Sequence, residues 1–192
     1  MTVVVGIGLL LAAGLLVSTS ACGAGPTIPD RFIYVTNQLD NTLSVIDGSA
    51  YKVVATVPAG AFPAGVAVAP DGGHAYIAQG GGDAVAVFDT RTNTITKIVS
   101  LAPASKPRGV ALTPNGQFLY VADGGSNSVS VLDTGTDQLV ATVPVGSQPV
   151  SVAVTPDGAS TYVANTGSND VSVIDTRTNR VVRVVPTGQY PA

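Results

Sequence analysis

Short hydrophobic runs separated by polar turn residues recur along the chain from residue 31 onward. In residues 150–192 the runs are SVAV, STYVAN, VSVID and RVVRVV. Each has the length of a β-strand, and its residues either alternate between apolar and polar or are β-branched, which is typical of strands. No stretch in this region shows the sustained spacing of an amphipathic helix. The pattern therefore predicts an all-β fold.

The runs are parts of a repeat. A tyrosine in the second run recurs at intervals of 42, 44 and 42 residues, at Tyr34, Tyr76, Tyr120 and Tyr162. Four strands in a unit of this length predict a β-propeller, in which each blade is a four-stranded antiparallel sheet. About four blades are present, in residues 31–63, 64–107, 108–149 and 150–192.

An aspartate ends the third run of every unit and precedes a turn, as in DTRTN at residues 89–93 and 175–179. An Asp side chain at such a place accepts hydrogen bonds from backbone N–H groups and closes the turn. Because every unit has this residue, a structural turn explains it better than metal binding does. The residues are Asp47, Asp89, Asp133 and Asp175.

Several separate signatures recur in register. Residues 34–37 read YVTN, and the units repeat the pattern PxxVAVTPDG, YVAN, VSVIDT and VVxVVPTG. This pattern resembles the YVTN-family β-propeller repeat of bacterial exported proteins and lipoproteins, over residues 31–191. The chain has no Trp, which argues against WD and kelch repeats. The resemblance implies a ring of about seven blades.

The strands of a blade are lettered a to d from the axis outward. The chain then begins in strand b near Arg31, supplies fifteen strands and lacks strand a of the first blade. We therefore expect an incomplete ring. Three explanations remain open: a truncated or split gene product, an open four-blade module completed by another copy or chain, and a compressed four-blade ring. An open arc would expose blade edges through which it can self-associate.

The first thirty residues have a different composition. Residues 3–17 are apolar and uncharged, too short to span a bilayer as a helix but typical of a secretory signal. The small residues before Cys22 resemble a bacterial lipoprotein signal, although Thr19 replaces the usual Leu. We predict a signal peptide at 1–22, lipidation at Cys22 and a flexible linker at 23–30. A cleaved signal with an incidental Cys and an uncleaved anchor are the alternatives. The chain is expected in the cell envelope, lipid-anchored, or secreted or periplasmic.

Charge and composition narrow the function. Charged residues make up 11% of the chain and the net charge is −3, so nucleic acid is not an expected partner. With a single Cys and a single His, the sequence predicts no zinc site, and it indicates neither a cofactor nor another metal. The histidine, His74, follows an a–b turn, and we interpret it as a surface residue.

The b–c and d–a loops are expected to share one face of the propeller, where loops commonly carry recognition. The b–c set is Asp40, Asn41, Asp83, Asn127 and Asn169, and the d–a set is Phe62, Lys106, Arg108, Gln148 and Tyr190. Lys106 and Arg108 lie in the longest d–a loop. We therefore predict a ligand-binding site in the d–a set, for an anionic or carbohydrate ligand.

No catalytic triad or phosphate-binding loop is present. The favoured hypothesis is an exported scaffold that binds a protein, carbohydrate or small molecule and touches the membrane only through its lipid. The alternatives are a fragment of a lactonase-like or lyase-like propeller enzyme and a structural surface-layer-like repeat. Catalysis by a pair of carboxylates stays open, because the chain has twelve Asp residues.

Overall fold

The computed structural model of the chain describes residues 4–7 and 32–192, which form sixteen strands in four four-stranded sheets. Blade 1 contains β1 (Val4–Ile7), β2 (Phe32–Asn37), β3 (Thr42–Asp47) and β4 (Lys52–Pro58). Blade 2 contains β5 (Pro63–Val68), β6 (His74–Gln79), β7 (Ala84–Asp89) and β8 (Thr94–Ser100). Blade 3 contains β9 (Pro107–Leu112), β10 (Phe118–Asp123), β11 (Ser128–Asp133) and β12 (Gln138–Pro144). Blade 4 contains β13 (Pro149–Val154), β14 (Ser160–Asn165), β15 (Asp170–Asp175) and β16 (Arg180–Pro186).

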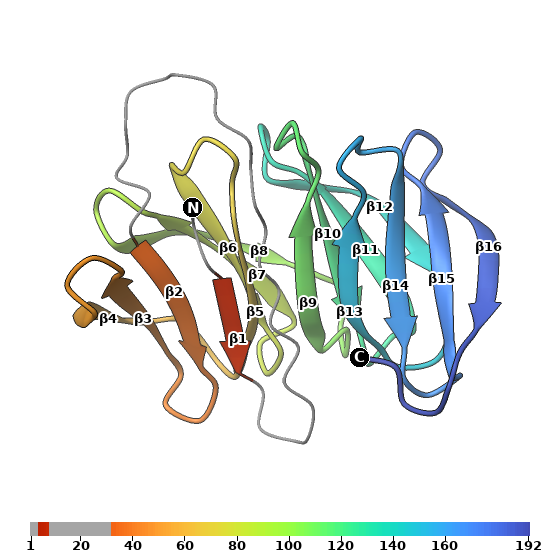
Figure 1. The fold of residues 1–192 in the computed structure, drawn as a ribbon, viewed down its shortest axis with the longest axis horizontal. Helices are drawn as coiled ribbons and strands as arrows, with labels where there is room; N and C mark the ends of the chain where they lie inside the picture. Colours follow the sequence, from red (N-terminus) through yellow and green to blue (C-terminus); the bar gives the residue numbers. More distant parts are fainter. Residues whose placement is uncertain (1–3, 8–31) are drawn as a thin grey trace.

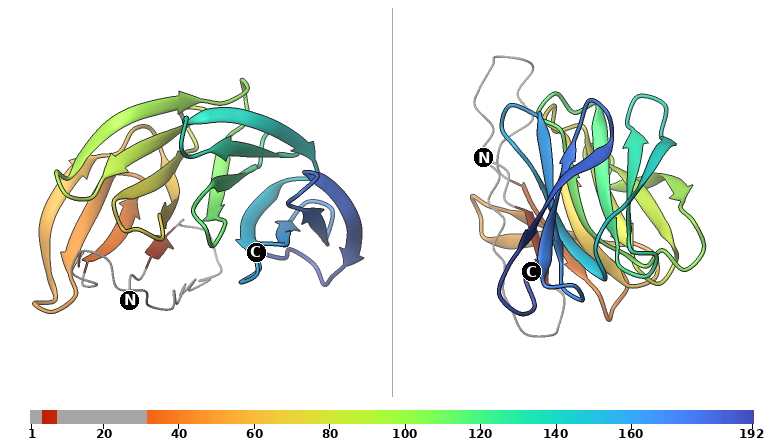
Figure 2. Two further views of the ribbon diagram at one scale, coloured as in Figure 1. Left: turned by 90° about the horizontal axis from the view of Figure 1, so that it is seen from above. Right: turned by 90° about the vertical axis from the view of Figure 1, so that its right-hand side faces the viewer.

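The four sheets follow one another across the molecule (Figure 1) and form an open arc when they are seen from above (Figure 2). Seen from above, β5, β9 and β13 lie on the inner side of the arc and β4, β8 and β12 on the outer side (Figure 2). The part of the chain that the structure describes contains no helix, and therefore none long and apolar enough to cross a membrane. The predicted all-β, incomplete propeller is confirmed.

Blade 1 differs from the prediction at its inner strand. The sequence predicts fifteen strands, with none at this place, but residues 4–7 form β1 there and pair with β2. The pairing is parallel, whereas β5, β9 and β13 each pair antiparallel with their b strand. The physical reason is that β2 otherwise presents an unpaired row of N–H and C=O groups, which an extended segment satisfies. These four residues belong to the predicted signal peptide; the remainder of that segment, Cys22 and the linker lie outside the described residues.

The core is divided among the interfaces between blades. Each blade has a leading face, which carries the repeat tyrosine, and a trailing face. Three apolar clusters each join the leading face of one blade to the trailing face of the next. In the first of them, Tyr34 of blade 1 meets Phe88 of blade 2 edge to face, with ring centroids 5.7 Å apart. A blade therefore buries its apolar sides only against its neighbours, as a propeller requires.

The turns are equally regular. In blades 2 to 4 the N–H of the glycine in each a–b turn donates to a carbonyl three residues earlier, at 2.8 Å. The glycine has a positive φ of 69–72°, which favours glycine, at Gly72, Gly116 and Gly158. The carbonyls of these glycines accept hydrogen bonds from the threonines that follow the turn aspartates, at 2.5–2.6 Å. The a–b and c–d turns are thereby fixed to each other in each of these blades.

Candidate functional site

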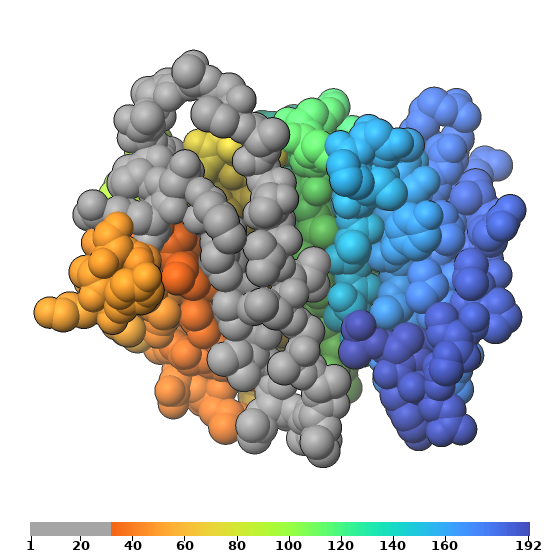
Figure 3. All heavy atoms as spheres, viewed as in Figure 1, coloured from red at the N-terminus to blue at the C-terminus, as the bar shows by residue number. Residues whose placement is uncertain are grey.

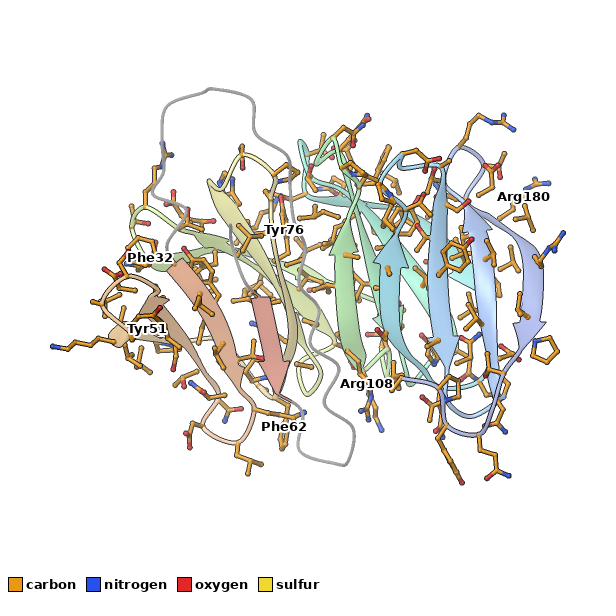
Figure 4. All side chains as sticks on the ribbon, viewed as in Figure 1. Phe32, Tyr51, Phe62, Tyr76, Arg108 and Arg180 are labelled. Carbon is orange, nitrogen blue, oxygen red and sulfur yellow. The ribbon has the colours of Figure 1, made fainter. Side chains whose placement is uncertain are left out.

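The b–c and d–a loops meet at one end of the arc, where a side-chain oxygen of each b–c loop accepts a backbone N–H of the following d–a loop. The four bonds measure 2.8–2.9 Å and join Phe62 to Asn41, Lys106 to Asp83, Gln148 to Asn127 and Tyr190 to Asn169. Phe62 and Arg108 lie at this lower end in Figure 4. The structure thus gives the Asn and Asp side chains of the b–c loops a supporting role. The end that they support is called the loop face below.

The residue that donates each of these bonds has a left-handed backbone. The φ angles are 49° at Phe62, 46° at Lys106, 51° at Gln148 and 55° at Tyr190. Bulky side chains adopt this conformation at a cost, and such strain gathers at functional sites. The side chains are presented to solvent: Phe62 is 50% exposed and Tyr190 is 74% exposed. One such side chain per blade therefore stands on the loop face.

Asp83 holds the longest d–a loop with both carboxylate oxygens. Oδ1 accepts the N–H of Lys106 and Oδ2 accepts the N–H of Ala104, each at 2.8 Å. These bonds, first the one from Lys106 and then the one from Ala104, lower the pKa of Asp83. Gly125 lies against the same loop, since a Cβ on Gly125 would stand 2.1 Å from the carbonyl oxygen of Ala104. The backbone beside Lys106 is consequently fixed before any ligand arrives.

Lys106 and Arg108 themselves are exposed. Neither makes an ion pair with another residue of the described part of the chain. The Arg108 side chain crosses Gly124, where an added Cβ would lie 3.2 Å from Nε. Two cations therefore lie two residues apart on a held loop, and neither forms an ion pair with a carboxylate of the described residues, although the charge of Lys106 contributes to the lowered pKa of Asp83. An anion is the ligand that this arrangement suits.

Asp123 is a residue that the sequence reasoning missed. It ends β10 at the loop-face end, is 1% exposed, and its Oδ2 accepts a 2.6 Å hydrogen bond from the Ser130 hydroxyl. Burial raises the pKa of Asp123 to about 6. Its Oδ1 has no hydrogen-bond partner among the described residues. The sequence does distinguish this position, because the other blades have an amide side chain there, at Asn37, Gln79 and Asn165.

The hydrogen bonds of the equivalent amide in blade 4 differ in direction from those of Asp123. In blade 4 the Asn165 Nδ2 donates to the Ser172 hydroxyl at 2.9 Å and to Asp170 Oδ1 at 2.7 Å. In blade 3 the direction is reversed, because the Ser130 hydroxyl donates to the carboxyl group. Asp123 is therefore a buried carboxyl group whose pKa burial raises to about 6, beneath the surface rather than open to a ligand.

The four turn aspartates lie at the opposite end of the arc. Oδ1 of each accepts one or two backbone N–H groups of its own c–d turn, at 2.8–3.1 Å, for Asp47, Asp89, Asp133 and Asp175. Two shallow hollows also lie at this end, each between neighbouring blades. They have volumes of about 310 and 290 Å³, and His74 lines the smaller one. Neither hollow includes a residue of the loop face.

Among the residues that the structure describes, no three His, Cys, Asp or Glu side chains gather as a metal site would require. The prediction for Cys22 concerns a residue outside the described ranges. The loop face with Lys106 and Arg108 is therefore the candidate site that the described residues offer.

A family model described as "Lactonase, 7-bladed beta-propeller" matches residues 26–138. This match covers more than half of the chain, from before β2 to the start of β12. No curated protein matches the sequence significantly.

Solved structures are also similar to the chain. Hydrazine synthase of Kuenenia stuttgartiensis is 36% identical with a TM-score of 0.62, over 65% of this chain and 36% of that one. A functionally unknown protein from Desulfotomaculum acetoxidans is 22% identical with a TM-score of 0.74, over 88% and 56%. The dihydro-heme d1 dehydrogenase NirN is 19% identical with a TM-score of 0.68, over 92% and 39%. The last two show the fold alone, and the chain spans between 36% and 56% of the length of these structures.

Proposed function

The chain belongs to the family of seven-bladed β-propeller lactonases, and from this premise we propose that it is an exported propeller that binds a small anionic molecule at the loop face. The loop face is the surface shared by the b–c and d–a loops. The observation that carries the proposal is the pair Lys106 and Arg108, two exposed cations on a loop whose backbone both oxygens of Asp83 hold.

The neighbouring side chains favour a sugar acid as the class of ligand. Lys106 and Arg108 suit a carboxylate, and Arg can bind it through two parallel hydrogen bonds. Phe62 and Gln148, at the same place in the flanking blades, offer an aromatic ring and an amide for the rest of the molecule. A fixed loop loses little conformational freedom on binding, which favours affinity.

Sodium gluconate is a suitable probe, with glucose as the uncharged comparison, in titration calorimetry. We expect gluconate to bind and Lys106→Ala with Arg108→Ala to weaken it at least about tenfold, which is about 1.4 kcal/mol. The matched control is Arg180→Ala with Arg183→Ala, which removes the same charge from β16; Arg180 lies at the far end from Arg108 in Figure 4. Equal affinity in both double variants, or no binding of gluconate, would remove this site.

Lactone hydrolysis is the second candidate, favoured by the family match. A carboxyl group with a raised pKa suits a general base, and burial raises the pKa of Asp123, at the loop-face end, to about 6. Its burial means that a substrate would reach it only after the loops open. The test is turnover of a panel of γ- and δ-lactones. Turnover by the wild-type chain that is abolished in Asp123→Asn would support hydrolysis. A wild-type chain that turns over none of them would contradict hydrolysis and leave ligand binding as the proposed function.

The cellular location of the protein is a further part of the proposal. We infer that the repeat is of the YVTN type, that residues 1–22 direct export, and that Cys22 carries lipid. Processing at Cys22 would remove β1 from the edge of β2. Mass spectrometry of the mature N-terminus tests this: an acylated Cys22 is expected, and an unmodified Cys22 or cleavage elsewhere contradicts it.

A further inference from the structure

Asp123 lies at an interface between two described blades. Blade 3, in green, has blade 2 on one side and blade 4 on the other (Figure 3). Side chains two residues apart on a strand share a face, so Leu119, Val121 and Asp123 of β10 point the same way. Leu119 and Val121 pack in the apolar cluster that blade 3 shares with blade 2. Asp123 therefore faces blade 2, at the loop-face end of that interface.

The backbone of Asp123 lies beside the two cations of the candidate site. In the register of β9 and β10, Asp123 is paired with Pro107, the residue that separates Lys106 from Arg108. Gly124 follows Asp123, and the Arg108 side chain crosses this glycine. The buried carboxyl group and the two exposed cations thus belong to neighbouring segments of one sheet.

The position of Asp123 faces the d–a loop of the preceding blade in both neighbouring repeats. In blade 2, Gln79 Nε2 donates to the carbonyl of Ala59 at 2.9 Å. In blade 4, the amide of Asn165 lies against Gly146, where an added Cβ would stand 2.7 Å from Nδ2. Ala59 and Gly146 belong to the d–a loops that lead into blades 2 and 4. By this repeat, the Asp123 carboxyl group faces the d–a loop that leads into blade 3.

Leu101 begins that loop and is the equivalent of Ala59, because the N–H of each donates to a carbonyl of its b–c loop, at 2.8 and 2.9 Å. The same loop carries Lys106. A protonated carboxyl group can donate a hydrogen bond to a carbonyl, whereas an ionised carboxylate can only accept one. The proton on Asp123 therefore determines whether β10 can donate a hydrogen bond to the Lys106 loop.

The ionised form of Asp123 is poorly accommodated. The Ser130 hydroxyl donates to Oδ2, but Oδ1 has no hydrogen-bond partner among the described residues. A buried charge without partners is costly, so the site favours the neutral acid. Burial raises the pKa of Asp123 to about 6, and the charge of Asp83 contributes in the same direction.

The charged groups at this end come from three elements. Asp83 lies in the b–c loop of blade 2, Lys106 in the d–a loop and Arg108 in β9, while β11 provides the hydroxyls of Ser128 and Ser130. The other titratable groups of the packed strands lie elsewhere: His74, Asp89 and Asp133 at the opposite strand ends, Tyr76 bonded to Thr134, and Lys97 paired with Asp137. Ionisation of Asp123 therefore places a second negative charge near Asp83 and lowers the positive potential at the cations.

We propose that the protonation state of Asp123 regulates anion binding at the loop face. The neutral acid donates a hydrogen bond to the Lys106 loop and holds it against β10. The ionised form loses this bond, repels Asp83 and opposes the charge of Lys106 and Arg108. The loop face accordingly binds an anion in acidic solution and releases it as the pH rises. The ligand in this inference rests on the proposed function, whereas the change in the loop needs no ligand.

Titration calorimetry with sodium gluconate at pH 5 and pH 8 measures the regulation. The gluconate carboxylate, Lys106 and Arg108 keep their charges over this range. We expect the wild-type chain to bind gluconate at least about fivefold more tightly at pH 5 than at pH 8. Asp123→Asn is neutral at both pH values and should bind at both with the affinity that the wild-type chain has at pH 5.

Asp157→Asn is the matched control. Asp157 is exposed in an a–b turn at the opposite end of the arc, and blade 3 has an asparagine in this place, at Asn115. The variant removes one carboxylate and should keep the wild-type pH dependence of gluconate binding. The same pH dependence in the wild-type chain and in Asp123→Asn would overturn the inference and leave the proposed function standing.

Amide hydrogen exchange without ligand tests the loop separately. The N–H groups of Ala104 and Lys106 donate to Asp83. After correction for the intrinsic pH dependence of exchange, they should be at least about threefold less protected at pH 8 than at pH 5, and equally protected at both in Asp123→Asn. Protection in the wild-type chain that does not change with pH would overturn the inference, whether or not gluconate binds. If gluconate binds at neither pH, the proposed function fails, and protection that falls only in the wild-type chain still supports regulation of the loop by Asp123.

Discussion

Tyr120 and Tyr162 hold the same position in successive blades, but their surroundings differ completely. Tyr120 is fully buried, donates a hydrogen bond to Asn179 of the next blade, and burial raises its pKa to about 12. Tyr162 has the same strand partners in its own sheet and is 45% exposed. The difference comes entirely from the neighbouring blade. In this molecule the strand pattern of a blade determines its sheet, and the neighbouring sheet determines whether the apolar side chains of that blade are buried.

The largest expected effect is on the free energy of unfolding, which should respond very differently to the loss of Tyr120 and of Tyr162. Tyr120→Ala removes a large, fully buried aromatic side chain and should cost about 3–5 kcal/mol of the free energy of unfolding. Tyr162→Ala removes a half-exposed one and should cost less than about 1 kcal/mol. Urea denaturation of both variants measures the two values. Similar costs would mean that the faces of blades 3 and 4 are equally covered within one chain.

A second comparison sets Asp123 against the amides of the other blades. The pKa of Asp123 is raised to about 6 from its ordinary 3.8, so the folded state favours the neutral acid. Its contribution to stability is full below about pH 3.8 and is lost as the pH rises to about 6. A shift of this size corresponds to about 2–3 kcal/mol.

Asp123→Asn should therefore raise the free energy of unfolding at pH 8 by about 2 kcal/mol and have little effect near pH 4. Urea denaturation across this pH range measures it, and Asn165→Asp provides the reciprocal variant in blade 4. An unchanged pH profile in Asp123→Asn would show that the carboxyl group is not titrating in the interior.

The smallest effect concerns the bonds between the b–c and d–a loops. Asn127→Ala removes the acceptor for the Gln148 N–H and should cost about 1 kcal/mol, the usual net value of one hydrogen bond. Asn127→Asp keeps the acceptor and should stay close to wild type. Amide hydrogen exchange at Gln148 separates the two variants, and equal protection in both would mean that this bond does not hold the loop.

The periodicity predicted the strands and the arc because every blade repeats the same burial pattern and turn chemistry. Pro, Asp and Gly at fixed places predicted the a–b turns, and their hydrogen bonds recur in the structure. The pattern could not predict β1, which satisfies an exposed edge without belonging to the repeat. Within the candidate site, the sequence indicated the loops but could not show that Asn127 and Asn169 support the backbone.

Two residues depart from the repeat at positions where the other blades agree in residue type. Asp123 stands where other blades have an amide, and Tyr51 stands where they have Asn or Asp. Burial of Asp123 and the left-handed backbone of Tyr51 depend on three-dimensional surroundings, so composition and spacing could not interpret either residue. In a repeat protein, the residues that differ from their equivalents in the other repeats are the ones whose structural surroundings are most informative.

Nitration of the tyrosines in this chain, read by peptide mass spectrometry, tests most directly whether the four described blades stack face to face, so that blades 1 to 3 but not blade 4 have a described neighbour on the leading face. Tyr162 should react together with the exposed Tyr51 and Tyr190, while Tyr34, Tyr76 and Tyr120 stay protected. Equal reactivity of Tyr120 and Tyr162 would contradict the account, because the same side chain would then have the same surroundings in an inner and an end blade.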